Sequence, residues 1–111
     1  MIRHGQASFG QRNYDVLSPT GILQARVLAG YLVQTGTVFD ALYIFTSGGA
    51  ISAAISMAVA VPPRDTARLA ALVTNTAITT FLYHQERLSL ASFNVASHLM
   101  LHNGGNLITY R

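Results

Sequence analysis

The residues of this sequence best suited to chemistry are Arg3, His4 and Gly5, which follow one another near the start of the chain. An imidazole nitrogen can attack phosphorus and form a phosphohistidine, and a neighbouring guanidinium offers forked donors to phosphoryl oxygens. A glycine lets the backbone turn closely past such a ligand. These three residue types could therefore form a phosphate-ester site with His4 as the nucleophile. Taken alone, a histidine beside an arginine is more often an ordinary surface pair.

Further stretches extend this pattern across nearly the whole chain. In the first half they are Ile2-Arg3-His4-Gly5-Gln6-Ala7-Ser8-Phe9, Tyr14-Asp15-Val16-Leu17-Ser18-Pro19-Thr20-Gly21, Gln24-Ala25-Arg26 and Phe39-Asp40-Ala41-Leu42-Tyr43. In the second half they are Phe45-Thr46-Ser47-Gly48-Gly49-Ala50-Ile51, Asn75-Thr76-Ala77-Ile78-Thr79, Ser92-Phe93-Asn94, His98-Leu99 and Ile108-Thr109-Tyr110-Arg111. In this order they resemble a histidine phosphatase of the phosphoglycerate-mutase type. The resemblance implies an α/β fold, with a phosphoglycerate-mutase-like sheet flanked by helices, here truncated and carrying a C-terminal β-hairpin.

The same resemblance implies a function for the first loop. His4 takes the position of the phosphorylated nucleophile and Arg3 that of a cation in the phosphate pocket, with Gly5 and Gln6 in the same phosphate-binding loop. The implied reaction is hydrolysis of a phosphomonoester, with no metal or organic cofactor. The implied ligands are a small phosphorylated substrate and inorganic phosphate.

The chain departs from the family pattern in its middle. The second pocket arginine and the acidic proton donor are absent, because the sequence passes from Tyr43 directly into Ile44 as if a central segment were missing. Ser47 lies where many members have a second catalytic histidine, and it could bind a phosphate oxygen together with the amides that begin the following helix. Asp15 and Glu86 are the acids to consider as donors, and their alternative is a solvated loop position. A non-catalytic phosphate-binding or degenerate remnant is therefore the alternative to an enzyme of impaired activity.

The element pattern fits an α/β chain. Ile2 and Arg3 are expected to end a strand, and Ser18 and Pro19 to begin a helix that ends near Gly36. Further expected elements are a doubly buried strand Ala41–Thr46, a helix Ala50–Ala60 after a Gly48-Gly49 turn, a short helix Asp65–Leu72, strands Thr74–Tyr83 and Leu88–Phe93 joined as a hairpin, and a last strand Leu107–Tyr110 in a turn-rich tail. Loss of a central segment would leave sheet edges and apolar faces uncovered, so we also expect self-association.

Composition limits the function classes. The chain has 111 residues, room for one domain (residues 1–111), and only 10% are charged against about 25% in ordinary soluble domains. The net charge is +3, but the seven basic residues, all arginines, are dispersed, which argues against nucleic acid as a partner. The absence of cysteine and of a secretory signal predicts a cytoplasmic protein. The uncharged stretch from Ala41 to Pro63 is long enough to span a bilayer, but its Ser, Thr and Gly residues favour a strand and a helix over membrane insertion.

The remaining titratable residues have structural interpretations. His84 lies in the expected hairpin turn, His98 is expected to be a structural residue, and His102 lies in the tail. His98 and His102 have the spacing of helical zinc ligands, but no third ligand is indicated, so no metal site is predicted. Arg64 and Arg68 beside Asp65 are expected to form a solvated helical face, the alternative being a phosphate-binding role.

Overall fold

The computed structural model describes residues 1–13, 16–36, 42–103 and 105–110. Its elements in chain order are β1 (Ile2–Arg3), α1 (Pro19–Gln34), β2 (Phe45–Thr46), α2 (Gly48–Val59), α3 (Pro63–Leu72), β3 (Ile78–His84), β4 (Arg87–Val95) and α4 (Ser97–Asn103). Strands and helices alternate in the first half, and a hairpin followed by a helix forms the second. The chain is therefore a small α/β fold, as the sequence predicts.

The four strands form one mixed sheet in the order β2-β1-β3-β4. β1 pairs in parallel with β2, aligning Arg3 with Thr46, and in antiparallel fashion with β3, aligning Ile2 with Ile78. β3 and β4 form the predicted hairpin. Its two turn residues, Gln85 and Glu86, both have positive φ, as a tight two-residue hairpin turn requires.

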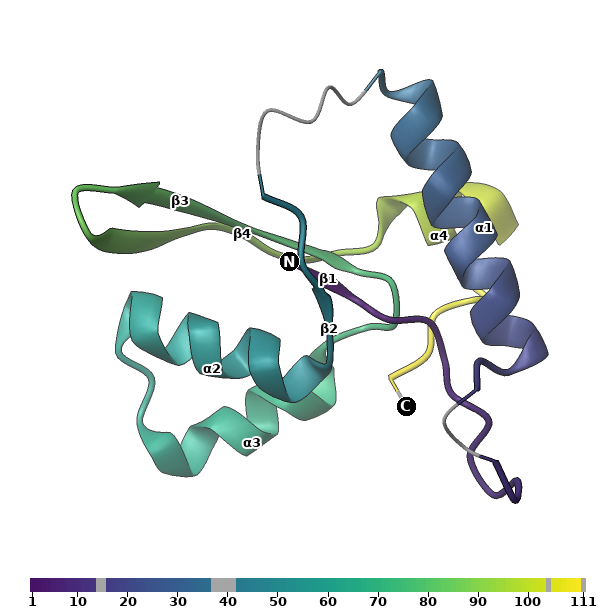
Figure 1. Cartoon of the computed structure of the whole chain (residues 1–111), viewed down its shortest axis with the longest axis horizontal. Coiled ribbons are helices and arrows are strands. Elements are labelled where there is room, and N and C mark those ends of the chain that lie inside the picture. Colours follow the sequence, from purple (N-terminus) through teal and green to yellow (C-terminus); the bar gives the residue numbers. More distant parts are fainter. Residues whose placement is uncertain (14–15, 37–41, 104, 111) are drawn as a thin grey trace.

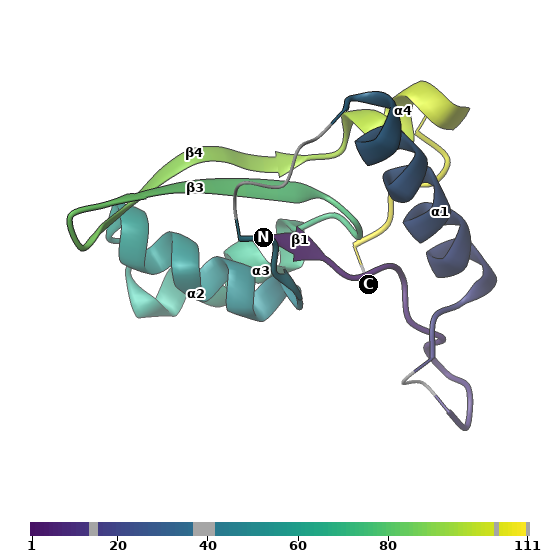
Figure 2. The ribbon, with the colours of Figure 1, turned by 45° about the horizontal axis from the view of Figure 1, so that its top comes forward.

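The helices flank the sheet in two groups (Figure 1). α2 and α3 lie under the hairpin, and the turned view in Figure 2 shows β3 and β4 running above them. Ile51 and Ile55 of α2 and the nearby Val73 are buried together, and Phe81 and Leu90 of the hairpin pack against them. α1 and α4 pack on each other at the other end of the molecule. The core thus sits between the hairpin and α2, with a separate helix pair beside it.

Two helix starts follow from capping side chains. The Ser18 hydroxyl accepts a hydrogen bond from the Gly21 amide at 3.0 Å, and Pro19 occupies the first turn of α1. Ser47 caps α2 in the same way, through the amide of Ala50. The expected Gly48-Gly49 turn is therefore wrong, because Ser47 draws both glycines into the first turn of α2.

The expected strand Ala41–Thr46 is wrong in length and burial. Only Phe45 and Thr46 form a strand, Leu42 is 83% exposed and Phe45 63%, and Ala41 lies outside the described residues. β2 is an edge strand and its partner β1 has only two residues. A longer buried strand consequently has nothing to pair with or pack against.

Three boundaries in the second half also differ from expectation. The strand expected from Thr74 begins at Ile78, because Thr76 adopts a positive φ that a strand cannot accommodate. The last strand expected at Leu107–Tyr110 does not form. The tail expected to be turn-rich begins with α4, whose Leu99 is completely buried.

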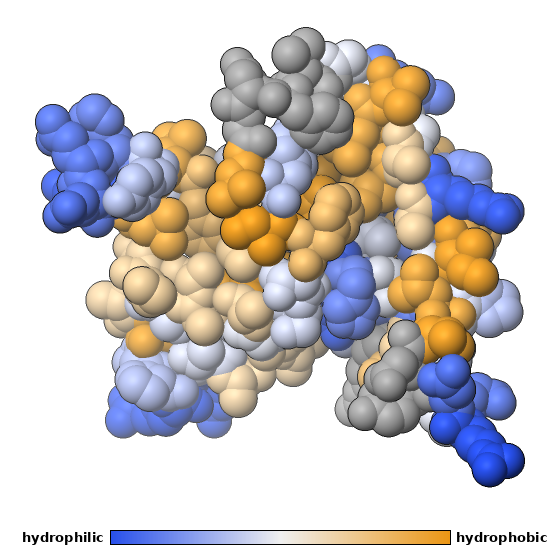
Figure 3. Space-filling model, in the orientation of Figure 1, coloured by the Kyte–Doolittle hydropathy of each residue, from blue (hydrophilic) through white to orange (hydrophobic). Residues whose placement is uncertain are grey.

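An apolar groove opens beside the sheet. It has a volume of about 740 Å³, and its lining includes Tyr31 of α1, Leu42, and Phe81, Tyr83 and Leu88 of the hairpin. In Figure 3 apolar residues gather in the central and upper part of the face shown. The expected uncovered apolar surface is therefore present. Within the described residues, no helix is long and apolar enough to cross a membrane.

Candidate active site

The end of β1 delivers Arg3 and His4 to the middle of the sheet. The Arg3 amide donates to the Ala77 carbonyl at 3.1 Å, and the His4 amide donates to the Thr46 carbonyl at 3.0 Å. Both residues are thus held from opposite sides, by the chain before β3 and by β2. The parallel pairing of β1 with β2 brings Ser47, which follows Thr46, to the same edge of the sheet as His4.

The His4 side chain is exposed, and one of its ring nitrogens forms a hydrogen bond. Nδ1 lies 2.7 Å from the carbonyl oxygen of Gly5. A carbonyl can only accept a hydrogen bond, so Nδ1 must carry the proton when the imidazole is neutral. The lone pair is then on Nε2, the nitrogen that can attack an electrophile.

The Arg3 guanidinium turns inward, beneath the start of α2. Nη1 donates to the Val73 carbonyl, while the buried Nε has no hydrogen-bond partner among the described residues. A Cβ placed on Gly48 would lie 3.5 Å from Cζ of Arg3 and 3.0 Å from the Ala70 carbonyl oxygen. Burial lowers the pKa of Arg3 from its usual value by desolvating the charge. The close approach of the Ala70 carbonyl thus favours glycine at position 48, whereas the guanidinium would be at ordinary contact distance from a side chain there.

The Gly5-Gln6 loop is held tightly against α1. A Cβ on Gly5 would lie 2.5 Å from the Gly21 carbonyl oxygen, and one on Gly21 would lie 2.1 Å from that of Gln6. The Gln6 amide donates to Oε1 of Gln24 at 2.8 Å, and the Gln6 side chain accepts from the Ser18 hydroxyl at 3.0 Å. Gln6 therefore attaches the loop to the start of α1 through hydrogen bonds of both its backbone and its side chain.

Glu86, one of the two acids considered as proton donors, lies far from His4. Glu86 is exposed in the hairpin turn, at the end of the hairpin remote from β1 (Figure 1). Six residues of strand separate the turn from Ile78, the partner of Ile2, which corresponds to about 20 Å. Glu86 is thus a solvated turn residue, and Asp15 lies outside the described residues.

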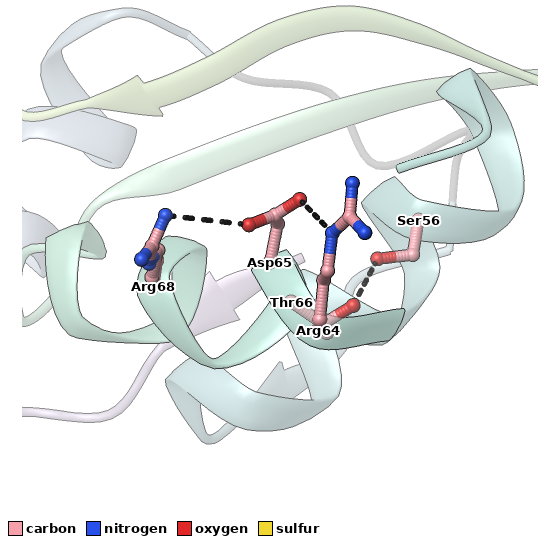
Figure 4. Close-up of polar contacts among 5 residues, drawn as sticks. All are labelled: Ser56, Arg64, Asp65, Thr66 and Arg68. Carbon is pink, nitrogen blue, oxygen red and sulfur yellow. Dashed lines mark hydrogen bonds and ion pairs between the residues drawn. The ribbon is translucent and has the colours of Figure 1, made fainter. Parts of the chain in front are cut away.

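The charged side chains of α3 form ion pairs with one another on an exposed face of the helix. Asp65 lies 3.6 Å from Nε of Arg64 and 3.5 Å from Nη1 of Arg68, and both arginine side chains are 85% exposed (Figure 4). The hydroxyls of Ser56 and Thr66, 2.8 Å apart, link α2 to α3 in the same region. The solvated helical face expected from the sequence is confirmed.

The other histidines separate into one buried and two exposed side chains. His98 is only 3% exposed, and its Nε2 lies 3.1 Å from the Thr76 hydroxyl, so the expected structural role is confirmed. Burial lowers the pKa of His98. His84 ends β3 and His102 lies in α4 rather than in a loose tail. Within the described residues no three metal-ligating side chains come together.

A buried polar network behind the loop has no counterpart in the sequence predictions. The side-chain amide of Gln24, fully buried, donates to the Leu107 carbonyl at 2.8 Å and to the Thr109 hydroxyl at 2.7 Å. The Asn75 side chain donates to the same hydroxyl at 2.8 Å, and the Thr76 amide donates to the Arg3 carbonyl at 3.0 Å. The only sequence signal was a glutamine on the core-facing side of a helix, where an apolar residue is normal.

Comparison with known proteins adds no relative: no protein-family model, no curated protein and no solved structure shows a significant match to the chain.

Proposed function

We propose that the chain hydrolyses phosphomonoesters through a phosphohistidine at His4, with low activity. The observation that carries this proposal is the hydrogen bond from Nδ1 of the exposed His4 side chain to the Gly5 carbonyl, which places the lone pair of the neutral imidazole on Nε2. The resemblance of the Arg3-His4-Gly5 region to histidine phosphatases supports the same assignment. Substrates would be small phosphorylated molecules, and the lack of cysteine favours action in the cytoplasm.

The proposed reaction has two steps. In the first, the Nε2 lone pair forms a bond to phosphorus, and the bond to the ester oxygen breaks with its electron pair moving to that oxygen. A water molecule protonates this leaving oxygen and becomes hydroxide, since Glu86 lies at the far end of the hairpin from His4. In the second step, a water oxygen forms a bond to phosphorus, and the bond from phosphorus to Nε2 breaks with its electron pair returning to Nε2. Inorganic phosphate leaves, the hydroxide of the first step takes up the proton that the attacking water loses, and the imidazole is restored.

The expected slowness has a physical cause. A phosphoryl group in transfer needs its spreading charge neutralised, and an acid helps the leaving oxygen depart. Here the nearby cation, Arg3, already donates through Nη1 to the Val73 carbonyl. Ser47 and the first amides of α2 could add hydrogen bonds, but no full charge.

The engagement of Arg3 also favours a second candidate function, phosphate binding without turnover. A guanidinium held by a backbone carbonyl keeps its charge and can attract a phosphate to the start of α2. It does not need to move during a reaction. In this case Ser47, Gly5 and Gln6 would contribute to a binding site in which His4 is not phosphorylated.

One experiment separates the two candidates. We expect purified protein to release phosphate from p-nitrophenyl phosphate, His4→Ala to release none above background, and His84→Ala, which changes an exposed histidine on the hairpin, to match wild type. Acid-labile phosphate on the wild-type protein, detected by ³¹P NMR, would identify the intermediate. Equal rates for wild type and His4→Ala would refute the hydrolase. Phosphate-dependent shifts of the Gly5 and Gly48 amides without turnover would then establish the binding protein.

A further inference from the structure

A second cavity lies between α1 and α4, and its lining includes none of the residues Arg3, His4, Gly5 and Gln6. Its volume is about 380 Å³, within the roughly 300–1,000 Å³ typical of small-molecule sites. The two helices lie side by side in Figures 1 and 2. One face of α1 and one face of α4 line the cavity, through Leu23, Arg26, Val27, Gly30, Tyr31 and Gln34 on α1 and His98, Leu101 and His102 on α4.

Gly30 keeps the cavity open. A Cβ built on this residue would have no atom within 4 Å apart from the helix itself. Glycine inside a helix costs about 0.5–1 kcal/mol relative to alanine. Glycine at position 30 thus lowers the stability of α1 at a place where a side chain would extend into the cavity.

A buried imidazole forms part of the wall. His98 is 3% exposed, and its ring centroid lies 5.6 Å from that of Tyr31 at a tilted angle. Its Nε2 is bonded to the Thr76 hydroxyl, whereas no hydrogen bond to Nδ1 is present among the described residues. The cavity therefore offers an aromatic surface formed by Tyr31 and His98.

The cavity lining carries one arginine. Arg26 and His102 are exposed and line the cavity, and none of the described residues of the lining is an aspartate or a glutamate. An arginine fork matches the two oxygens of a carboxylate, and Leu23, Val27 and Leu101 offer apolar contact. We propose that this cavity binds a small aromatic carboxylate, with the ring against Tyr31 and Leu101 and the carboxylate on Arg26.

Benzoate is a suitable probe, followed by ¹H–¹⁵N NMR on the full chain. We expect saturable shifts of α1 and α4 amides with a dissociation constant of about 1 mM, as befits a ligand of this size. Uncharged benzamide should bind about tenfold more weakly, because it loses the charge-assisted bond to Arg26. Inorganic phosphate should leave these amides unshifted at the same concentration, because it has no ring.

Two variants complete the test. Arg26→Gln should weaken benzoate binding about tenfold, whereas Arg12→Gln, at another exposed arginine, should not change it. Gly30→Leu should abolish binding while the amides of the hairpin keep their positions, which shows that the fold is intact. Equal binding of benzamide and benzoate, shifts of these amides by phosphate, or unchanged binding by Arg26→Gln or Gly30→Leu would overturn the proposal. The test does not involve His4, so its outcome is independent of the proposed hydrolase activity.

Discussion

The same substitution at two glycines of α1 should change stability in opposite directions. Gly21 lies in the first turn, where an added Cβ would come within 2.1 Å of the Gln6 carbonyl oxygen. Gly30 lies in the fourth turn, where an added Cβ meets nothing within 4 Å. Both residues belong to one helix, so Gly21→Ala and Gly30→Ala form a matched pair.

The magnitudes follow from the contacts. In Gly21→Ala the Gln6 backbone must move by about 1 Å to reach an ordinary contact distance, and overpacking of this kind costs about 1–3 kcal/mol. The move also stretches the bonds from the Gln6 amide to Gln24 and from the Ser18 amide to the Gln6 carbonyl, each worth about 1 kcal/mol. We expect a net destabilisation of about 3 kcal/mol. Gly30→Ala should instead stabilise by about 0.5–1 kcal/mol, because alanine favours the helix.

Urea denaturation followed by circular dichroism measures both changes. For a chain of this size each kcal/mol corresponds to about 4 °C in melting temperature, so thermal melts give an independent check. Wild-type stability in Gly21→Ala would refute the close approach of the loop to α1. A loss of stability in Gly30→Ala would refute the open space above that residue.

Two further predictions concern buried polar side chains. Gln24→Leu should lower the free energy of unfolding by about 3 kcal/mol in urea denaturation, because it leaves the Gln6 amide and the Leu107 carbonyl without partners. Gln34→Leu, at an exposed site of the same helix, should change it by less than about 0.5 kcal/mol. Similar urea midpoints for the two variants would contradict the buried network. Burial lowers the pKa of His98 in the folded state, so the unfolded chain takes up a proton first as the pH falls. The free energy of unfolding should therefore be highest above about pH 6.5 and decrease below it. His98→Gln should remove this decrease, and His102→Gln should leave it in place. A decrease of stability below this pH that is the same in His98→Gln would exclude His98 as its cause.

Local sequence determined the features that depend on adjacent residues. Ser18 and Pro19 set the start of α1 because a hydroxyl and a fixed φ act within one turn. The β-branched and aromatic residues before and after His84 predicted the hairpin, which forms. The placement of His4 directly after a strand was also predicted, and Ile2 and Arg3 form β1.

Only the tertiary structure decided what those residues meet. Arg3 binds the carbonyl of Val73, 70 positions away, and Gln24 binds that of Leu107, 83 positions away. No local pattern encodes such partners, because they depend on how β1, α1 and the C-terminal segment come together in space. The same long-range packing left β2 a two-residue edge and made α4 a helix by burying Leu99. The sequence alone thus indicated a nucleophile, whereas the fold determined which cation, loop and cavity surround the two candidate sites.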